Sequence, residues 1–184
     1  MLTLFHDYTS PASAIAVARL QRLADEGIAI EFVGFEAVGV DMALPPSLDV
    51  LAALDDLAEE AAAEGVVLRR PKLLPPTARA HAVGTIAATH TLGASWRQRC
   101  YTAFWSDGTD IDDTDTLVAL AADAGLPAEQ VGSAVADRAF IASVRRAVGR
   151  HRRNGVGGVP TILAQRTLIP GLLPEDQLRE LAAY

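Results

Sequence analysis

The sequence predicts an α/β protein in which an all-helical subdomain interrupts a β-α-β…β-β-α frame. Strand-like apolar runs occur near the two ends of the chain, whereas the long stretch between them has helical periodicity broken by glycine and proline. With 184 residues and 50% apolar content, the chain suits one compact domain. We expect the frame to comprise about residues 1–46 and 155–184, with the helical insertion over about 47–154.

The N-terminal segment predicts a strand followed by a helix. Leu2 to Phe5 is a short apolar run typical of a buried strand. Pro11 suits the first turn of a helix, where its missing N–H costs no hydrogen bond, and Thr9 or Ser10 can serve as the N-cap. Apolar residues keep the helical period until Gly27, where we expect the helix to stop.

A second strand is expected over Ile28 to Phe35, a run apolar enough to lie inside a sheet. Because a helix between two strands makes a right-handed crossover, the two strands should be parallel. Pro45-Pro46 then breaks the chain, and Ser47 is a suitable N-cap for a helix that ends at Gly65.

The stretch after Thr77 is helical in pattern, and its breaks predict about four helices. The breaks lie at Gly93, Asp107-Gly108, Gly125-Leu126-Pro127 and Asn154-Gly155. The frame then resumes with a strand near Pro160 to Ala164, a short strand near Leu168 to Ile169 and a closing helix from Pro174 to Ala183.

Charge and cysteine content exclude several classes of protein. The net charge of −7 disfavours binding to nucleic acid or to an acidic membrane surface. The single cysteine, Cys100, excludes an internal disulfide and a multi-cysteine metal site, and we expect it to be buried and inert. No run approaches the ~20 apolar residues that span a bilayer, and no leader pattern precedes the first strand, so a cytoplasmic location is expected.

Four motifs in order resemble the DsbA-like branch of the thioredoxin superfamily. Residues 10–13 read Ser-Pro-Ala-Ser directly after the first strand, and residues 155–163 contain Gly-Val-Pro-Thr. Between them, residues 76–81 resemble the family's Asn-Thr-x-x-Ala-His helix start, and residues 103–112 resemble its aromatic–Gly–Asp-Ile segment. The resemblance covers essentially the whole chain, is nearest to FrnE-type and 2-hydroxychromene-2-carboxylate isomerase-like members, and implies a thioredoxin-like fold.

The motif at residues 10–13 departs from the redox members of that family, which carry Cys-Pro-x-Cys there. A turn without those sulfurs cannot cycle a dithiol and a disulfide, so we expect no dithiol–disulfide oxidoreductase activity. Ser-Pro-x-Ser resembles the isomerase and the kappa-class glutathione transferases, in which the first serine hydrogen-bonds the sulfur of bound glutathione. The resemblance implies that Ser10 is catalytic and that Ser10 and Pro11 bind a thiol cofactor.

The identity of that thiol stays open. The same families hold the γ-glutamyl end of glutathione with a late Ser/Gln-Asp-Arg element, whereas residues 170–176 read Pro-Gly-Leu-Leu-Pro-Glu-Asp here. The cofactor expected from the resemblance is therefore glutathione or another low-molecular-weight thiol.

Ser10 can be interpreted either as a residue that activates a bound thiol or as a helix cap. A thiolate beside the positive end of a helix, hydrogen-bonded by a hydroxyl, has a lowered pKa and is a better nucleophile at neutral pH. The alternative is that Ser10 only caps the helix ahead of Pro11. Ser13 is expected to be solvent-facing or bonded to the backbone, with substrate contact as a second option.

The resemblance also implies a cis peptide bond between Val159 and Pro160, which would turn the Val159 backbone toward the helix start. A ligand's peptide can pair there as an added strand, so both residues are candidate cofactor-binding groups. The alternative is a tight turn that serves the fold alone.

Weaker candidates are Asp7, His81 and Trp105, as substrate contacts or as groups that support the site. Asp7, with His6, is a strand-end residue that could tune the turn's electrostatics, and His81 is a polar helix-start residue with a possible acid/base role. Four aromatic residues are expected to lie in the hydrophobic core, with the wall of an apolar pocket as the alternative: Trp96, Tyr101, Phe104 and Trp105. The arginine-rich run from Arg145 to Arg153 fits the dipole at a helix C-terminus, although one arginine could hold a substrate carboxylate.

Three hypotheses follow for function. The leading one is a thiol-cofactor-dependent isomerase or transferase that acts on a small, aromatic or otherwise electrophilic compound. The second is a non-catalytic family member that binds a peptide or a small molecule. The third is a protein classed with the DsbA-family oxidoreductases by ancestry alone. A small-molecule substrate is the expected partner, nucleic acid and membrane are not, and a homodimer is the oligomeric state to test.

Overall fold

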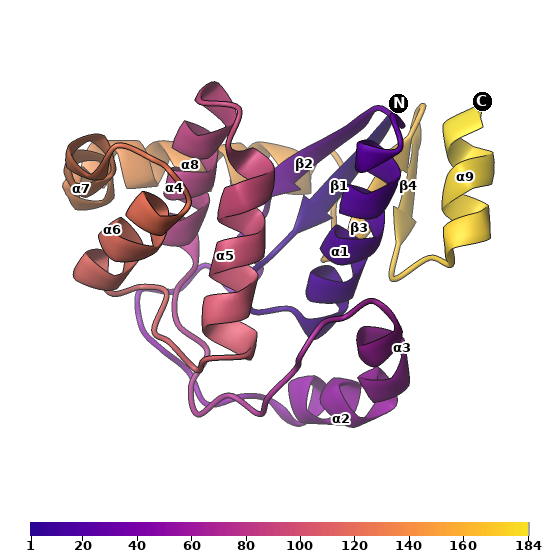
Figure 1. The fold of residues 1–184 in the computed structure, drawn as a ribbon, viewed down its shortest axis with the longest axis horizontal. Coiled ribbons are helices and arrows are strands. Elements are labelled where there is room, and N and C mark those ends of the chain that lie inside the picture. The colour runs from indigo at the N-terminus through magenta and orange to yellow at the C-terminus, as the bar shows by residue number, and fades with distance from the viewer. Residues whose placement is uncertain (184) are drawn as a thin grey trace.

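The computed structural model describes residues 1–183 and has a four-stranded mixed sheet at its centre (Figure 1). The strand order is β2-β1-β3-β4, in which β1 (Leu2–His6) pairs parallel with β2 (Ile30–Gly34) and antiparallel with β3 (Thr161–Ala164). β4 (Thr167–Pro170) pairs antiparallel with β3. The parallel first pair and the late hairpin confirm the predicted β-α-β…β-β-α order.

The helices of the frame begin and end at the residues that local chemistry favours. α1 (Pro11–Asp25) lies across one face of the sheet (Figure 1), starts with proline in its first turn and is capped by Ser10. Gly27 follows it at φ +99°, a conformation that glycine adopts without strain. α9 (Glu175–Ala183) lies beyond β4 at the other side of the frame.

The prediction that the second strand lies inside the sheet is wrong, because β2 forms an edge. β1 has β2 on one side and β3 on the other, which leaves β2 without a partner on its outer side. Its apolar residues are half-buried against side chains instead: the Arg97 guanidinium lies 3.7 Å from the centre of the Phe32 ring. The apolar side chains of β2 are therefore covered by other side chains, although the strand pairs with β1 on one side only.

The segment after Pro45-Pro46 contains two short helices instead of the single helix predicted. α2 (Leu48–Asp56) is capped by Ser47, whose Oγ accepts a hydrogen bond from Val50 N–H as expected. α3 (Ala58–Ala63) follows after Leu57, which leaves the helical conformation at φ −99° and ψ 3°.

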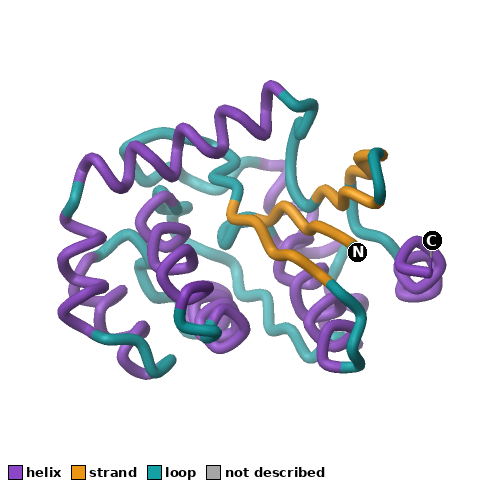
Figure 2. Tube along the Cα trace, turned by 90° about the horizontal axis from the view of Figure 1, so that it is seen from above, coloured by secondary structure: helices purple, strands orange, loops and turns teal. Residues whose placement is uncertain are grey.

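The remaining insertion has five helices within the described residues, one more than predicted. They are α4 (Ala78–Thr89), α5 (Gly93–Trp105), α6 (Thr114–Asp123), α7 (Ala128–Ala136) and α8 (Arg138–Arg153). The additional break is at Asp137, which is extended and accepts a hydrogen bond from Ala139 N–H through its carboxylate, so it ends α7 and caps α8. In Figure 1, α4 to α8 form one group beside the sheet, whereas α2 and α3 lie below α1; Figure 2 shows the strands gathered on the side of the two termini.

The main core runs from the sheet through α1, α4 and α5 into the insertion. The predicted core aromatics Trp96, Tyr101, Phe104 and Trp105 are all buried in it. Cys100 is buried too, and burial raises the pKa of its thiol well above the ordinary value, with the charge of Asp7 adding to the rise. The expectation of a buried cysteine is confirmed.

A buried arginine joins the frame to the insertion. Arg19 on α1 donates from Nε to Glu64, from Nη2 to Glu60 and from Nη1 to the Leu173 carbonyl, each of the two ion pairs measuring 2.7 Å. Its neighbours come from α3, from the residue after α3 and from the loop before α9, so one side chain connects three distant segments. No helix among residues 1–183 has the length and hydropathy that crossing a membrane requires.

Candidate functional site

The turn between β1 and α1 presents Ser10 at the start of the helix. The Ser10 N–H donates to the Asp7 carbonyl at 3.1 Å, and the Ser10 Oγ accepts a hydrogen bond from Ser13 N–H at 3.1 Å. Because Oγ is an acceptor in this cap, its own O–H remains able to donate to another group. Ser10 is half-buried, next to the positive end of the helix dipole, and Pro11 is buried beside it.

Ser13 points inward. Its side chain is fully buried, and its Oγ accepts a hydrogen bond from Asp7 N–H at 3.4 Å. The backbone-bonded interpretation of Ser13 is therefore confirmed and the solvent-facing one is wrong. The two serines of the turn have separate tasks, since Ser10 caps α1 and Ser13 ties the turn to the strand.

Asp7 organises the turn from beneath. It is only 1% exposed, and its carboxylate accepts hydrogen bonds from Ala37 N–H at 2.7 Å and from His81 Nε2 at 3.1 Å. Its carbonyl also accepts one from the Tyr101 hydroxyl at 3.0 Å. One buried residue thus holds the loop after β2, helix α4 and helix α5 against the end of β1.

His81 fits into this arrangement only because a glycine faces it. A Cβ on Gly34 would lie 2.4 Å from His81 Nδ1, closer than real side-chain atoms come. Nδ1 is buried and has no hydrogen-bond partner among the described residues. With Nε2 directed at a carboxylate, the proton is assigned to Nε2 and Nδ1 is left as a free acceptor.

His6 and two tyrosines complete what we call the polar hub: Asp7, His6, Tyr8, His81 and Tyr101. His6 Nδ1 lies 3.0 Å from the Tyr101 hydroxyl, and because that hydroxyl donates to Asp7, His6 is the donor in this pair. Burial lowers the pKa of His6 well below 6.5, with further lowering from His81 and Arg97. Burial also raises the pKa of both tyrosines well above 10.

The sequence indicates Asp7, His6 and His81 one by one and Tyr101 as a core residue or pocket wall, but it does not predict that they meet or that Tyr8 joins them. Adjacent polar and aromatic residues at the end of a buried strand were the available signal. Trp105, a candidate pocket wall, is 1% exposed, and its indole N–H donates to the Tyr8 carbonyl at 2.9 Å. Its side chain therefore supports the backbone of the turn from the core.

Val159 and Pro160 lie at the same end of the sheet as Ser10. The bond between them is cis, and β3 begins at Thr161, which pairs with Phe5 of β1. Continuing this register by two residues places Val159 opposite Asp7, three residues before Ser10. Among residues 1–183, no hydrogen bond engages the Val159 N–H or C=O, whereas the Pro160 carbonyl accepts one from Gly171 N–H at 2.9 Å.

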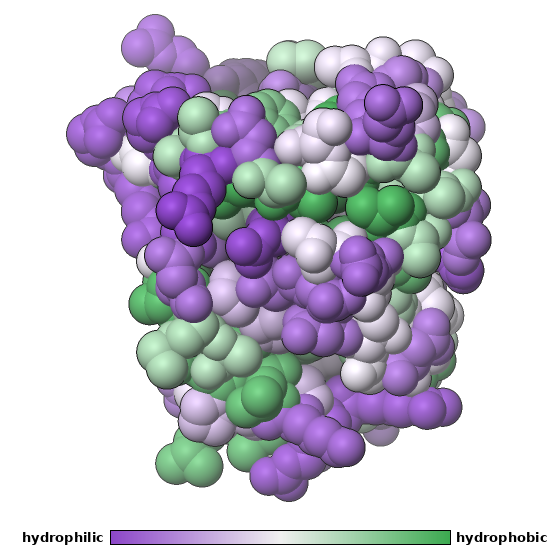
Figure 3. All heavy atoms as spheres, turned by 90° about the vertical axis from the view of Figure 1, so that its left-hand side faces the viewer, coloured by the Kyte–Doolittle hydropathy of each residue, from purple (hydrophilic) through white to green (hydrophobic). Residues whose placement is uncertain are grey.

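An apolar pocket of about 160 Å³ opens beside the turn. Its polar lining residues are Asp7, Thr9, Glu36, Ser47 and Thr77. Its apolar walls come from the loop between β2 and α2, from α2 and from the segment before α4: Val38, Val40, Met42, Leu44, Pro45, Val50, Leu74, Pro75 and Pro76. Figure 3 shows hydrophobic side chains gathered at the lower edge of one face, at the height of these loops in Figure 1.

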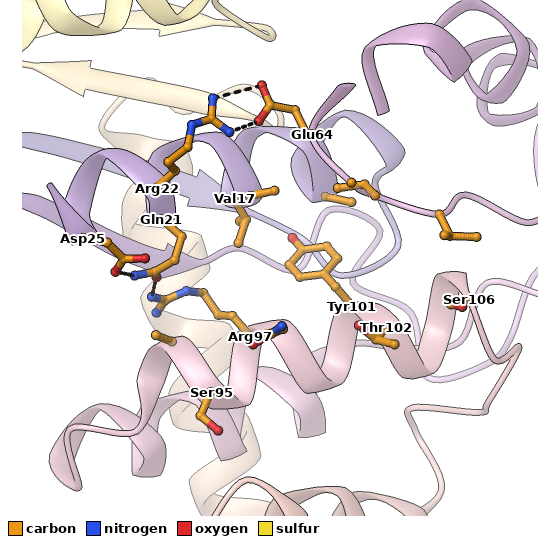
Figure 4. A pocket seen from close by; sticks show the side chains of 17 residues that line it. Val17, Gln21, Arg22, Asp25, Glu64, Ser95, Arg97, Tyr101, Thr102 and Ser106 are labelled. Atoms are coloured by element: carbon orange, nitrogen blue, oxygen red, sulfur yellow. Dashed lines mark hydrogen bonds and ion pairs between the residues drawn. The ribbon is translucent and has the colours of Figure 1, made fainter. Parts of the chain in front are cut away.

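A larger groove of about 770 Å³ lies between α1 and α5, away from the predicted site residues (Figure 4). Arg22 and Glu64 form an ion pair on its rim, and Gln21 bridges Arg97 and Asp25 through hydrogen bonds of 2.7 and 2.8 Å. Both acidic residues thus have protein partners. Polar and apolar side chains both line this groove.

Two arginines of the run at the end of α8 hold the loop after β2. Arg145 pairs with Glu36 at 2.8 Å and with Asp41, and the pairing raises the pKa of Arg145. Arg152 donates to the carbonyls of Glu36 and Ala37 at 3.0 and 2.7 Å. These guanidinium groups therefore stabilise a wall of the apolar pocket. Among the described residues, no group of three His, Cys, Asp or Glu side chains could hold a metal ion.

A thioredoxin-type architecture is defined by three features of this structure. A helical insertion separates the strands of one mixed sheet in sequence, a cis peptide bond precedes β3, and the start of α1 lies at the same end of the sheet. A family model, the DSBA-like thioredoxin domain, matches residues 1–183. The chain belongs to the DsbA-like thioredoxin family, and the resemblance drawn from its motifs is confirmed.

Several solved structures share this fold. A probable DsbA oxidoreductase from Streptomyces coelicolor is 23% identical, with a TM-score of 0.84 over 99% of this chain and 88% of that one. A 2-hydroxychromene-2-carboxylate isomerase is 22% identical, with a TM-score of 0.78 over 99% and 92%. The cytosolic disulfide reductase DsbM from Pseudomonas aeruginosa, solved with GSH, is 22% identical, with a TM-score of 0.67 over 99% and 95%. No curated protein sequence matches the chain.

Proposed function

We propose that this protein is a thiol-cofactor-dependent isomerase or transferase, with Ser10 as the residue that hydrogen-bonds the cofactor's sulfur. The observation that carries the proposal is the cap geometry of Ser10, whose Oγ accepts from Ser13 N–H and so keeps its O–H free to donate. A sulfur placed over the helix start would receive that hydrogen bond and the favourable end of the dipole. Both interactions stabilise the thiolate, which is the nucleophilic form.

The cofactor's peptide portion would pair with the Val159 backbone. Its N–H and C=O are unengaged among the described residues, and the sheet register puts them beside the turn. Support for glutathione as the thiol comes from two relatives, a structure of DsbM that contains GSH and an isomerase whose turn the Ser-Pro-Ala-Ser motif resembles. Since residues 170–176 lack the Ser/Gln-Asp-Arg element, the proposal covers other low-molecular-weight thiols as well.

The substrate would occupy the apolar pocket beside the turn. Its volume of about 160 Å³ suits a small molecule, and its apolar walls suit an aromatic or otherwise hydrophobic electrophile. The bound thiolate would add to an electrophilic carbon of a double bond, so that a carbon–sulfur bond forms while the π bond breaks and its electron pair moves onto the substrate. In a transferase this pair takes up a proton from water and the conjugate departs. In an isomerase the adduct rotates about the new single bond, the pair then re-forms the double bond and the carbon–sulfur bond breaks, which returns the thiolate.

A thiolate titration tests this proposal. The protein is saturated with glutathione, cysteine or 2-mercaptoethanol in turn, and the ultraviolet absorbance of the bound thiolate is followed against pH. Loss of a charge-assisted hydrogen bond, about 1.5–3 kcal/mol, should raise the pKa of the bound thiol by about one to two units in Ser10→Ala. Binding itself should weaken less than thiolate formation.

Asp137→Ala is the matched control, because it removes another helix cap at a site remote from the turn. It should leave the thiol's pKa unchanged. If Ser10→Ala also leaves it unchanged, or if none of the three thiols binds, Ser10 is a helix cap and the protein is a non-catalytic binding member of the family.

The same proposal predicts no catalysis of insulin reduction or of disulfide formation in a reduced substrate. The one cysteine is buried in the core, and its raised pKa keeps the thiol protonated at neutral pH. Turnover in either assay that disappears in Cys100→Ala would show that Cys100 is catalytic and would contradict this interpretation of the turn.

A further inference from the structure

We propose that the protein has a second binding site, for a small organic carboxylate, in a cavity between the β2 edge of the sheet and helices α4, α5 and α8. The cavity measures about 260 Å³ and is separate from the pocket beside Ser10. Asp7 lines the pocket and His81 lines the cavity, so their hydrogen-bonded pair stands between the two. The proposal does not depend on a thiol cofactor.

The cavity presents cationic and hydrogen-bonding groups and no acid. Arg97, three histidines and Tyr8 contribute to its lining, which includes neither aspartate nor glutamate. The histidines are His6, His81 and His151. The Asp7 carboxylate, which contacts His81 of the lining, already accepts hydrogen bonds from Ala37 N–H and from His81. The field inside the cavity therefore favours an anion.

Arg97 is the group that would bind the anion. Its guanidinium stacks on the Phe32 ring at 3.7 Å, and its Nη2 donates to Gln21 at 2.7 Å. Its Nε has no partner, and within residues 1–183 no acidic side chain forms an ion pair with it. A largely buried cation without a counter-charge is costly, and a carboxylate ligand would supply that charge with the bidentate geometry that guanidinium prefers.

The contrast with Arg99, on the same helix, supports this assignment. Arg99 is exposed and forms an ion pair with Asp123 across to α6, as surface arginines commonly do. Arg97, two residues earlier, faces the sheet and finds an amide and an aromatic ring in place of an acid. The unpaired arginine is therefore the inward one, at the cavity.

The other walls specify a small, flat ligand. Tyr8, Phe32 and Trp96 give aromatic surfaces, and Gly84, Gly93 and Ala147 leave the space between the helices open. The volume falls just below the ~300–1,000 Å³ of pockets for drug-sized ligands, so a single-ring or shorter carboxylate fits best. In the groove between α1 and α5, by comparison, Asp25 and Glu64 would repel such an anion.

Calorimetric titration with benzoate, and with benzamide as its neutral isostere, tests the proposal. Benzoate should bind and benzamide should bind at least about tenfold more weakly, because only benzoate supplies the counter-charge. Arg97→Met should weaken benzoate at least about tenfold, and the control Arg99→Met should leave the affinity unchanged. Equal binding of the two probes, equal effects of the two variants, or no heat with millimolar benzoate would overturn the site.

A second variant keeps the test independent of the stability of Arg97→Met. Ala147→Phe introduces a ring from α8 into the cavity while Arg97 remains in place, and it should abolish benzoate binding. Undiminished binding in Ala147→Phe would show that benzoate lies elsewhere. Ser10→Ala should bind benzoate as the wild type does, so failure of this site and failure of the thiol site give different results.

Discussion

The two regions that flank Ser10 are opposite in chemistry. Beneath the turn, the polar hub places His6, Asp7 and His81 among the most buried side chains of the molecule. Beside the turn, the loop between β2 and α2 exposes apolar side chains, with Val38 53% and Met42 63% accessible. This reverses the ordinary distribution, in which polar groups face water and apolar groups are buried.

The difference indicates what each region contributes to a binding site. The polar hub is held by hydrogen bonds within the protein, and such a network in a low-dielectric interior is stiff and costly to break. The exposed loop is attached through side chains of Asp7, Arg145 and Arg152 and through a backbone bridge between Leu44 and Leu74. The turn therefore lies between one region fixed by a buried hydrogen-bond network and one loop that presents apolar side chains to water.

The largest effect on stability is expected from Asp7→Ala, which removes the residue that connects the polar hub to the exposed loop. The change leaves His81 Nε2 without an acceptor in the interior, at about 1–3 kcal/mol, and it removes the acceptor of the N–H of Ala37, an exposed residue. It also releases the exposed loop from the hub. Urea denaturation should show a free energy of unfolding lower by several kcal/mol, while Asp123→Ala, at an exposed surface pair, should cause no comparable change. Similar results for the two variants would show that the hub is not rigid.

An intermediate effect is expected from pH acting on His6. Burial depresses the pKa of folded His6 below 6.5, so the unfolded chain binds a proton that the folded chain does not. Stability should therefore fall as pH drops below about 6.5, with a contribution of up to ~1.4 kcal/mol per pH unit from this residue.

The variant His6→Asn keeps a donor toward Tyr101 and should lose that part of the slope. His90→Asn, at an exposed histidine after α4, should retain it. The measurement is the free energy of unfolding at several pH values between 5 and 7, and equal slopes in wild type and His6→Asn would contradict the assignment.

The smallest effect on stability is expected in the exposed loop. Met42→Ser removes apolar surface that is already in contact with water, so the free energy of unfolding should change by less than about 0.5 kcal/mol. A matched change in the core, Leu4→Ser, should be severely destabilising because Leu4 is fully buried. A large fall in the free energy of unfolding of Met42→Ser would mean that the loop is packed into the core and does not simply present apolar side chains to water.

The sequence predicted those features that depend on neighbouring residues. The caps at Ser10 and Ser47, the stop at Gly27 and the strands at both ends follow from local chemistry, and the structure confirms them. The edge position of β2 and the helix break at Asp137 were missed, since a strand's neighbours and the fate of one aspartate depend on tertiary contacts.

The candidate site was predictable only in part for the same reason. Motif resemblance located the turn and the Val159–Pro160 bond, but Tyr101 reaches the turn, and Arg97 the separate cavity, from α5, far away in the sequence. The sequence pattern does not predict that Arg97 lacks an acidic partner. Whether an arginine forms an ion pair depends on which side chains the tertiary structure brings into contact.

The pairing of β1 with β3 has a consequence for how the protein is made. Phe5 lies beside Thr161, so the middle of the sheet cannot close until the ribosome has released nearly the whole chain. Until then β1 can pair only with β2, and the backbone N–H and C=O groups of its other edge stay open to strands of other nascent chains. Synthesis that pauses late, after the insertion but before β3, should therefore yield aggregates, whereas release followed by rapid closure protects the edge.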